Sequence, residues 1–489
     1  MKRFGFLSLL FAAAFARADI RYGIAPDLNA NALAVRVQVE KGLEAPEFVM
    51  PVWCPGFYVV QNFSTKVYDV RATDEMGKRL KVDAMASSWK VENPSKGFVT
   101  FTYKVQGDDP GLGFFAVHVD STTTYINGPG AFVYLRGHKN DFCHLTITKP
   151  QNWEIATSMD YDQDSYLGHG YDDFADHPIQ LGIFERRKFS VNGIPFELVV
   201  VSGDQQGVGS IDDAAGQIAQ LAKPALKMMG SQGFKRYLTI LHLVAGNFSG
   251  GLEHRASHVE ALQNPGNLIS PTLWTHEFFH SWNVKQIRPK LLGPFDYTQA
   301  VRTPSLWFAE GVTDYYAKIT AYRAGYLNED GLLDELSHEI GMLQASNNRL
   351  KYSLADASMS IWEFGGVSVG DFSYYNKGQI AGLVFDAAIR GATDGRKSLD
   401  DVMRLLWTRY RLPQAGYEES DLMAAIDEVA GVSLDDLYRK LINTTDDVPY
   451  DVLQRIGLKV SDMGGFRLIH DSGMSATAQR LYEGWISIP

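Results

Sequence analysis

The 489-residue sequence has few cysteines, no excess of basic residues and no long apolar run beyond its first residues. Two cysteines are too few for a disulfide-rich scaffold. Lys and Arg number 46 against 57 Asp and Glu, which gives a net charge of -11, and no basic tract occurs, so we expect no nucleic-acid partner. A content of 45% hydrophobic and 21% charged residues is that of an ordinary globular protein, which excludes disordered and collagen-like classes.

The first 18 residues have the pattern of a secretory signal peptide. Lys2 and Arg3 precede an apolar run over residues 4–15, and Ala16-Arg17-Ala18 forms an A-x-A cleavage site. The run is shorter than the roughly 20 residues that span a bilayer, and no later segment is apolar enough to do so. We therefore expect cleavage before Asp19, export to the periplasm or beyond, and no integral membrane segment in the mature protein.

From residue 19 to 201 the hydrophobic period is two. Apolar residues alternate with polar or small ones over 33–39 and 99–105, which predicts an antiparallel β domain with a sandwich as the default arrangement. Cys143 alternates with apolar residues as on an inward-facing strand. Cys54 and Cys143 therefore fit two separate buried thiols at least as well as one disulfide.

Residues 202–454 show helical patterns with clear starts and stops. Ser210 is the expected N-cap of a helix that contains Pro224 and ends near Gly230. A strand is expected at Tyr237–Val244, and Ser270-Pro271 places a capping hydroxyl before a proline at a helix start. The pattern predicts a mainly helical domain with one small sheet contribution.

The segment W-T-H-E-F-F-H-S-W over residues 274–282 contains an H-E-x-x-H motif. On a helix, His276 and His280 lie one turn apart and point the same way, so both imidazoles can reach one metal ion. Glu277 lies beside them, where it can act as a general base on a water molecule. The alternative is a helix whose histidines are merely packed or exposed.

A catalytic zinc needs a third protein ligand, and Glu310 is the candidate. It lies among large apolar neighbours in L-W-F-A-E-G-V-T-D-Y-Y, where an unpaired carboxylate would be costly. Asp314, one turn later, could accept a hydrogen bond from a ligand histidine. Equally, Asp314 could be a helix acid that faces solvent.

These motifs resemble those of the glycyl aminopeptidase family of zinc metallopeptidases. The resemblance rests on H-E-F-F-H-S-W-N-V-K-Q-I-R-P from His276, on P-F-D-Y at Pro294–Tyr297, on W-F-A-E-G-V-T-D-Y-Y at Trp307–Tyr316 and on P-V-W-C-P-G-F-Y at Pro51–Tyr58. It implies a multidomain α+β protein with an N-terminal β domain and a thermolysin-like, mainly helical zinc peptidase domain. It also implies one zinc ion per chain, bound by His276, His280 and Glu310, with Glu277 as general base.

Related zinc aminopeptidases suggest two more sites by analogy. Glu253, in N-F-S-G-G-L-E-H at Asn247–His254, would hold the α-ammonium of a peptide substrate, and Gly250 and Gly251 would let backbone approach it. A plain glycine turn with a surface glutamate is the alternative.

Tyr375, in Y-Y-N-K-G, matches a tyrosine that donates to the oxyanion of the reaction. Alternatively, Tyr374 and Tyr375 simply pack a helix start. Lys285 and Arg288 belong to the family pattern, but no chemical role is assigned to them, and structural ion pairs are the expected account.

Residues 455–489 depart from the family pattern, which usually continues into a PDZ domain. They are too few to bury a core alone, so we expect a truncated or degenerate PDZ-like segment, packed on residues 202–454 or partly loose.

The sequence thus predicts an exported zinc aminopeptidase that removes N-terminal residues, Gly or Ala by the family name, from peptides with a free N-terminus. The alternatives are a zinc endopeptidase of the same fold and a non-catalytic periplasmic peptide-binding protein.

Overall fold

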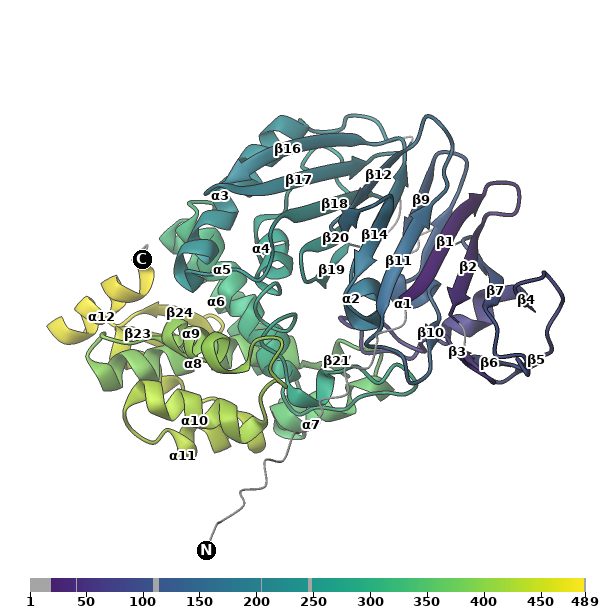
Figure 1. The fold of residues 1–489 in the computed structure, drawn as a ribbon. Helices are drawn as coiled ribbons and strands as arrows, with labels where there is room; N and C mark the ends of the chain where they lie inside the picture. The colour runs from purple at the N-terminus through teal and green to yellow at the C-terminus, as the bar shows by residue number, and fades with distance from the viewer. Residues whose placement is uncertain (1–18, 41, 109–113, 204, 245–248, 488–489) are drawn as a thin grey trace, which may run out of the picture.

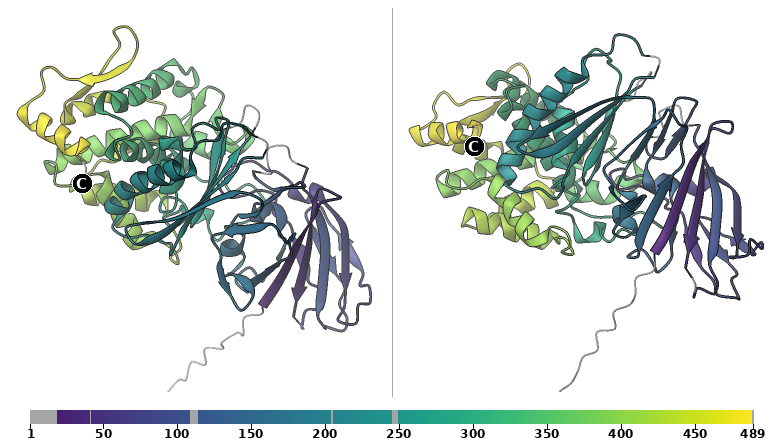
Figure 2. Two further views of the ribbon diagram at one scale, coloured as in Figure 1. Left: turned by 90° about the horizontal axis from the view of Figure 1, so that it is seen from above. Right: turned by 45° about the horizontal axis from the view of Figure 1, so that its top comes forward.

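The structure is a computed structural model that describes residues 19–40, 42–108, 114–203, 205–244 and 249–487. The predicted signal peptide, and Asn247 and Phe248 of the glycine motif, lie outside the described residues. N-terminal strands occupy one end of the molecule, a second sheet lies next to them, and helices form the other end (Figure 1). The C-terminal segment is farthest from the N-terminal strands in both further views (Figure 2).

The N-terminal part is built almost entirely of strands, with two short helices. Its strands are β1 (Asp19–Asp27), β2 (Ala32–Val39), β3 (Glu47–Val49), β4 (Val67–Thr73), β5 (Val82–Ala84), β6 (Ser88–Val91), β7 (Val99–Gln106), β8 (Val117–Val119), β9 (Thr123–Ile126), β10 (Tyr134–Leu135), β11 (Phe142–Ile147), β12 (Glu154–Thr157), β13 (Asp160–Asp162), β14 (Ser165–Gly168) and β15 (Ile179–Gly182). The helices, α1 (Gly128–Ala131) and α2 (Tyr171–Ala175), are too short to have produced a helical pattern in the sequence.

These strands form three sheets around a shared apolar core. A seven-stranded sheet has the order β13-β14-β11-β1-β2-β7-β4, and two four-stranded sheets have the orders β10-β3-β6-β5 and β12-β15-β9-β8. Pairing is antiparallel except between β1 and β11. Val35 and Val37 pair with Tyr103 and Phe101, and all four side chains are buried, so the alternation in the sequence correctly identified the inward face. Cys54 and Cys143 are separate buried thiols.

A five-stranded sheet connects this part to the helices. Its order is β16-β17-β18-β20-β19, with β16 (Glu185–Val191), β17 (Ile194–Val201), β18 (Tyr237–Leu243), β19 (Gly250–His254) and β20 (Ser257–Leu262). The predicted division between residues 201 and 202 needs correction, because β16 and β17 precede it but share this sheet with β18. The period of two does not change between the two parts, so the sequence carries no signal at the true division. The sheet is also larger than the small contribution expected.

The remaining chain is mainly helical. The helices are α3 (Ile211–Met229), α4 (Pro271–Phe279), α5 (Thr313–Arg323), α6 (Glu329–Ala345), α7 (Leu354–Ser360), α8 (Tyr374–Thr393), α9 (Leu399–Tyr410), α10 (Glu419–Ala430), α11 (Asp435–Tyr438) and α12 (Ala476–Ile486). The shorter turns are η2 (Lys290–Leu292), η4 (Asn348–Leu350), η5 (Ile361–Glu363) and η7 (Tyr450–Ile456), and the π-helical turns are η3 (Trp307–Val312) and η6 (Arg439–Asn443). The short turn η1 (Phe63–Lys66) belongs to the N-terminal part, between β3 and β4. Two-residue strands β21 (Ser368–Val369) and β22 (Phe372–Ser373) pair before α8.

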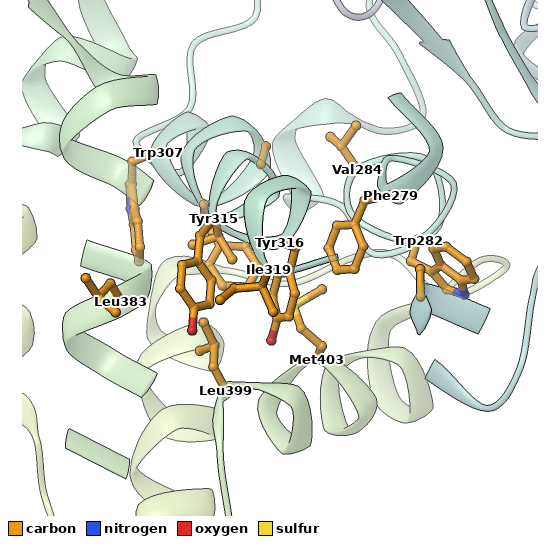
Figure 3. Packing of buried hydrophobic residues seen from close by; sticks show 14 of the residues in the cluster. Phe279, Trp282, Val284, Trp307, Tyr315, Tyr316, Ile319, Leu383, Leu399 and Met403 are labelled. Atoms are coloured by element: carbon orange, nitrogen blue, oxygen red, sulfur yellow. The ribbon is translucent and has the colours of Figure 1, made fainter. Parts of the chain in front are cut away.

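Aromatic side chains pack the core between α4 and α5. Phe279 stacks on Tyr316 with ring centroids 4.5 Å apart, Tyr315 packs edge-on against Tyr316, and Trp307 lies beyond Tyr315 (Figure 3). Helix α3 begins after the expected N-cap Ser210, whose side chain accepts a hydrogen bond from the Asp213 N–H. The stacking of Phe279 on Tyr316 packs α4, which carries the H-E-x-x-H motif, against α5.

The C-terminal segment packs on the helices. It consists of the hairpin β23 (Leu458–Ser461) and β24 (Arg467–His470) followed by α12. Trp485 is fully buried and donates to the Tyr315 hydroxyl, and the Leu468 N–H donates to Ser337. Of the two arrangements expected for this segment, residues 455–487 adopt the packed one, whereas the PDZ-like character is not confirmed. Among the described helices, none combines the length and apolar character needed to cross a bilayer.

Candidate metal centre and active site

Helix α4 aims its two histidines at one point. Pro271 occupies the first turn, where a missing N–H costs nothing, and Trp274 anchors the helix by donating to Thr239 on β18 at 3.1 Å. His280 follows α4 directly and keeps helical backbone angles, so His276 and His280 remain one turn apart. Both imidazoles are buried, and their Nε2 atoms lie 2.9 Å apart.

Glu310 completes a set of three metal-ligand atoms. Its Oε2 lies 3.1 Å from His280 Nε2 and 3.6 Å from His276 Nε2. A tetrahedral zinc ion with ligands at about 2.0–2.1 Å separates its ligand atoms by about 3.4 Å, so the three atoms have the spacing of one face of such a site.

The hydrogen bonds on the far side of each ring set the tautomers. The His276 Nδ1–H donates to Asp314 Oδ1 at 2.7 Å, and the His280 Nδ1–H donates to the carbonyl of Asn283 at 2.8 Å. In its neutral form, each ring therefore presents an Nε2 lone pair to the other ring and to Glu310. Two buried lone pairs and a carboxylate that face one another are stabilised by a cation between them.

The electrostatics of the three groups support the same conclusion. Burial would lower the pKa of both histidines, but Asp314 and Glu310 more than offset it, so the pKa of His276 and of His280 is raised. Burial would raise the pKa of Glu310, yet the two imidazoles hold it well below its ordinary value. The site therefore favours positive charge at its centre, and the donor set fits a zinc ion.

Glu310 lies on a π-helical turn and is oriented from the N-terminal part of the chain. The turn η3, which carries Glu310, runs directly into α5. Turns of this kind occur frequently at functional sites, where they redirect a side chain. The buried Tyr58 hydroxyl donates to Glu310 Oε1 at 3.2 Å, which leaves Oε2 to face the histidines.

Glu277 lies against a glycine on the adjacent strand. A Cβ atom on Gly251 would lie 2.1 Å from Glu277 Oε1, so only glycine leaves room for this carboxylate. Gly251 thus makes room for the predicted base. Gly250 pairs with Ala261 on β20, at the start of β19. Burial raises the pKa of Glu277 to about 8, although the two histidines act to lower it, and its Oε2 has no hydrogen-bond partner among the described residues.

Glu253 brings a second carboxylate to the centre. Ligand atoms of Glu253, Glu277 and His280 all lie within 4.8 Å of one another, and all three side chains are buried. This group does not form an independent metal site, because its one histidine already contributes its free nitrogen to the first site. A buried carboxylate beside the predicted base is instead suited to a cationic group of the substrate.

Tyr375 lies at the side of His276. Its ring is within 25° of parallel to the imidazole, with centroids 6.2 Å apart. Burial, and then the Glu310 carboxylate, raises the pKa of the Tyr375 phenol well above its ordinary value, so the hydroxyl stays protonated and can donate. The neighbouring Tyr374 is different, because its hydroxyl donates to the Gly366 carbonyl at 2.8 Å.

Four residues near the centre were not assigned from the sequence. Tyr58 orients Glu310, Asn283 orients His280 through its carbonyl, and Lys285 and Asp176 form an ion pair at 2.9 Å behind Glu253. Tyr58 and Lys285 belong to motifs that carried the family resemblance, but nothing in those motifs indicates what the side chains contact. Asp176 had no sequence signal.

Comparisons with known proteins agree with this site. A family model described as M61 glycyl aminopeptidase matches residues 270–381, and one described as the Peptidase M61 N-terminal domain matches residues 21–183. Together they cover more than half of the chain. No curated protein matches the sequence.

Solved structures share the fold. An aminopeptidase N family protein from Idiomarina loihiensis has a TM-score of 0.83 at 24% identity, over 90% of this chain and 79% of that one. An M1 zinc metallopeptidase from Deinococcus radiodurans, in a mutant form bound to a Tyr-Ser-Ala substrate, has a TM-score of 0.56 at 14% identity, over 88% of this chain and 94% of that one.

Proposed function

This chain belongs to the M61 glycyl aminopeptidase family and is a metallo-aminopeptidase, and from that premise we propose that it uses zinc to release N-terminal Gly or Ala from peptides outside the cytoplasm. One observation carries the choice of an aminopeptidase mechanism: the buried Glu253 carboxylate lies within 4.8 Å of the Glu277 carboxylate and of His280. A carboxylate at that place attracts the α-ammonium of a peptide and holds the first peptide bond next to the base.

His276, His280 and Glu310 would hold the zinc ion. When bound, zinc supplies a Lewis acid that polarises the carbonyl of the scissile bond. Asp314 and the Asn283 carbonyl keep both Nε2 atoms free for the metal, and Tyr58 keeps Glu310 Oε2 directed at it.

Glu277 and Tyr375 would carry out the remaining steps. Glu277 takes a proton from the attacking water and returns it to the leaving amine. Its free Oε2 and its confinement against Gly251 support this role. The Tyr375 hydroxyl donates to the oxyanion that develops from the scissile carbonyl, which stabilises the transition state more than the substrate.

Export is proposed from the signal-peptide pattern of residues 1–18. The preference for Gly or Ala follows the family name, and peptides with a free N-terminus are the proposed substrates.

The test compares hydrolysis of glycyl and alanyl p-nitroanilide with hydrolysis of the N-acetylated glycyl compound. We expect cleavage of the free-amine substrates alone, loss of activity with a chelator, and recovery when zinc is added back. Glu253→Gln should lower kcat/KM for free-amine substrates by about 100-fold or more while zinc content stays at one per chain.

Other outcomes point to the alternatives. Equal cleavage of acetylated and free substrates, unaffected by Glu253→Gln, would indicate an endopeptidase. No cleavage by protein that retains stoichiometric zinc would indicate a peptide-binding protein.

A further inference from the structure

Behind Glu253 lies a buried group of charges that the proposed chemistry does not use. The Lys285 ammonium, with 5% of its side chain exposed, is 2.9 Å from Asp176 Oδ1 and 3.7 Å from Glu253 Oε1. Asp176 also accepts hydrogen bonds from the Arg255 backbone N–H at 3.0 Å and from His254 Nδ1 at 3.2 Å. Lys285 therefore lies between two carboxylates, one from each part of the chain, and is closer to Asp176.

The ionisation of these groups can be read from their surroundings. Burial would raise the pKa of Asp176, but Lys285 and His254 hold it well below its ordinary value, so Asp176 is an anion. Burial would lower the pKa of Lys285, but Asp176 and Glu253 raise it, so Lys285 is a cation. Burial lowers the pKa of His254, which is therefore neutral near pH 7.

Arg288 also interacts electrostatically with Asp176, and Glu277 and His280 lie on the metal side of Glu253. The two groups next to Asp176 and Lys285 themselves, Cys54 and Arg255, add no net charge to the cluster. Burial raises the pKa of the Cys54 thiol to about 12, so it is neutral. The Arg255 guanidinium pairs with Asp173 at 2.7 Å, and these two charges cancel. With Glu253 ionised, the group of Asp176, Glu253 and Lys285 holds two negative charges and one positive charge.

The space around Glu253 is closed by apolar and backbone groups. A small pocket beside Glu253 and Lys285 is otherwise lined by Trp53, Pro55, Gly56, Tyr58, Val284, Leu292 and Phe295. A Cβ atom on Gly56 would lie 2.4 Å from Glu253 Oε2, so the backbone of the N-terminal part approaches this carboxylate closely. Water is largely excluded there, and an uncompensated charge interacts strongly with its neighbours.

We propose that Asp176 and Lys285 are positioning residues that set the charge of the α-ammonium subsite at one negative unit, which one substrate ammonium neutralises. The inference rests on the proposed role of Glu253. Asp176 holds the Lys285 ammonium away from Glu253 and so keeps Glu253 available. Without Asp176, Lys285 pairs with Glu253 alone and the subsite becomes neutral. The substrate α-ammonium would then be a second cation beside Lys285 and would be repelled.

If Asp176 and Lys285 set the charge of the subsite, KM should follow that net charge, which it would not do if they formed a purely structural ion pair. Asp176→Asn should raise KM for glycyl p-nitroanilide by about tenfold or more, with kcat within about threefold of the wild type. Lys285→Met should not raise KM, because it leaves Glu253 without a competing cation. The double variant Asp176→Asn with Lys285→Met restores one negative charge, and its KM should return to within about threefold of the wild-type value.

The measurements use the zinc-loaded full chain, with zinc content and thermal unfolding recorded for each variant. Asp400→Asn is the matched control, since Asp400 is a buried carboxylate that pairs with Arg323 at 3.5 Å and has no contact with the cluster. It should leave KM unchanged. A double variant with a KM at least as high as that of Asp176→Asn would overturn the inference, and so would an Asp176→Asn variant with unchanged KM.

Failure of the proposed function is distinguishable from failure of this inference. If Glu253→Gln hydrolyses free-amine substrates as well as the wild type does, the subsite itself is assigned wrongly. If Glu253→Gln is impaired but Asp176→Asn shows no increase in KM, only the role of Asp176 and Lys285 is wrong.

Discussion

Replacement of Tyr58 by Phe tests whether the N-terminal part of the chain contributes to metal binding. The substitution removes one hydroxyl, which donates to Glu310 Oε1 at 3.2 Å in a fully enclosed environment, and leaves the ring in place. In this variant Glu310 Oε1 no longer accepts a hydrogen bond from residue 58, so the carboxylate can rotate away from the histidines. Loss of a group that orients a metal ligand typically weakens metal binding by 10–100-fold.

The magnitude should fall at the lower end of that range. The distance of 3.2 Å is longer than the usual 2.7–2.8 Å for O–H···O hydrogen bonds, so this bond is weaker than an ideal one to a charged acceptor. We expect the zinc dissociation constant to rise by about tenfold, which corresponds to about 1.4 kcal/mol. The assay is competition with a chromophoric chelator at equilibrium.

Tyr374→Phe is the matched control for this substitution. Tyr374 is also buried and also loses one donated hydrogen bond, but its acceptor is the Gly366 carbonyl and not a metal ligand. It should lower stability by about 1 kcal/mol and leave zinc affinity unchanged. Equal zinc affinity in Tyr58→Phe and the wild type would refute the argument that Tyr58 orients Glu310.

Two further substitutions probe buried carboxylates of the five-stranded sheet and α4. Gly251→Ala places a Cβ atom 2.1 Å from Glu277 Oε1, so the carboxylate must move. We expect kcat to fall by about 100-fold while the zinc content is retained. An unchanged kcat would contradict the argument that this contact positions Glu277. Burial raises the pKa of Glu260 from 4.5 to about 8. Between these two pH values Glu260 keeps its proton in the folded state and releases it in the unfolded state. The free energy of unfolding therefore falls as the pH rises through this range. In thermal unfolding, Glu260→Gln should therefore be more stable than the wild type by a few kcal/mol at pH 8 and equally stable near pH 4. A stability difference that does not depend on pH would show that Glu260 does not titrate in this range.

Local spacing predicted the residues that lie on one helix or one turn. His276, Glu277 and His280 are placed by the geometry of α4 alone, because residues four apart on a helix share a face. For Asp314, four residues after Glu310, the spacing left two readings open, and the structure shows the one in which it accepts a hydrogen bond from His276. Such predictions need no knowledge of the fold.

The residues that sequence reasoning missed are brought in by tertiary structure. Tyr58 is 252 residues from Glu310, and Asp176 is 109 residues from Lys285, so no periodicity relates them. The extent of the five-stranded sheet was missed for a similar reason, because only pairing with β18 assigns β16 and β17 to that sheet and no local pattern does. The division between parts of this chain is a property of hydrogen-bond partners and not of composition.

The N-terminal part contacts the proposed active site at three separate points. The active site therefore consists of more than the H-E-x-x-H motif and Glu310. Tyr58 sets the orientation of a ligand, the Gly56 backbone presses on Glu253, and Asp176 holds Lys285. None of these residues is itself a metal ligand. A small shift of the N-terminal part relative to α4 would therefore change metal affinity and the charge of the ammonium subsite together, because both depend on contacts across the same interface.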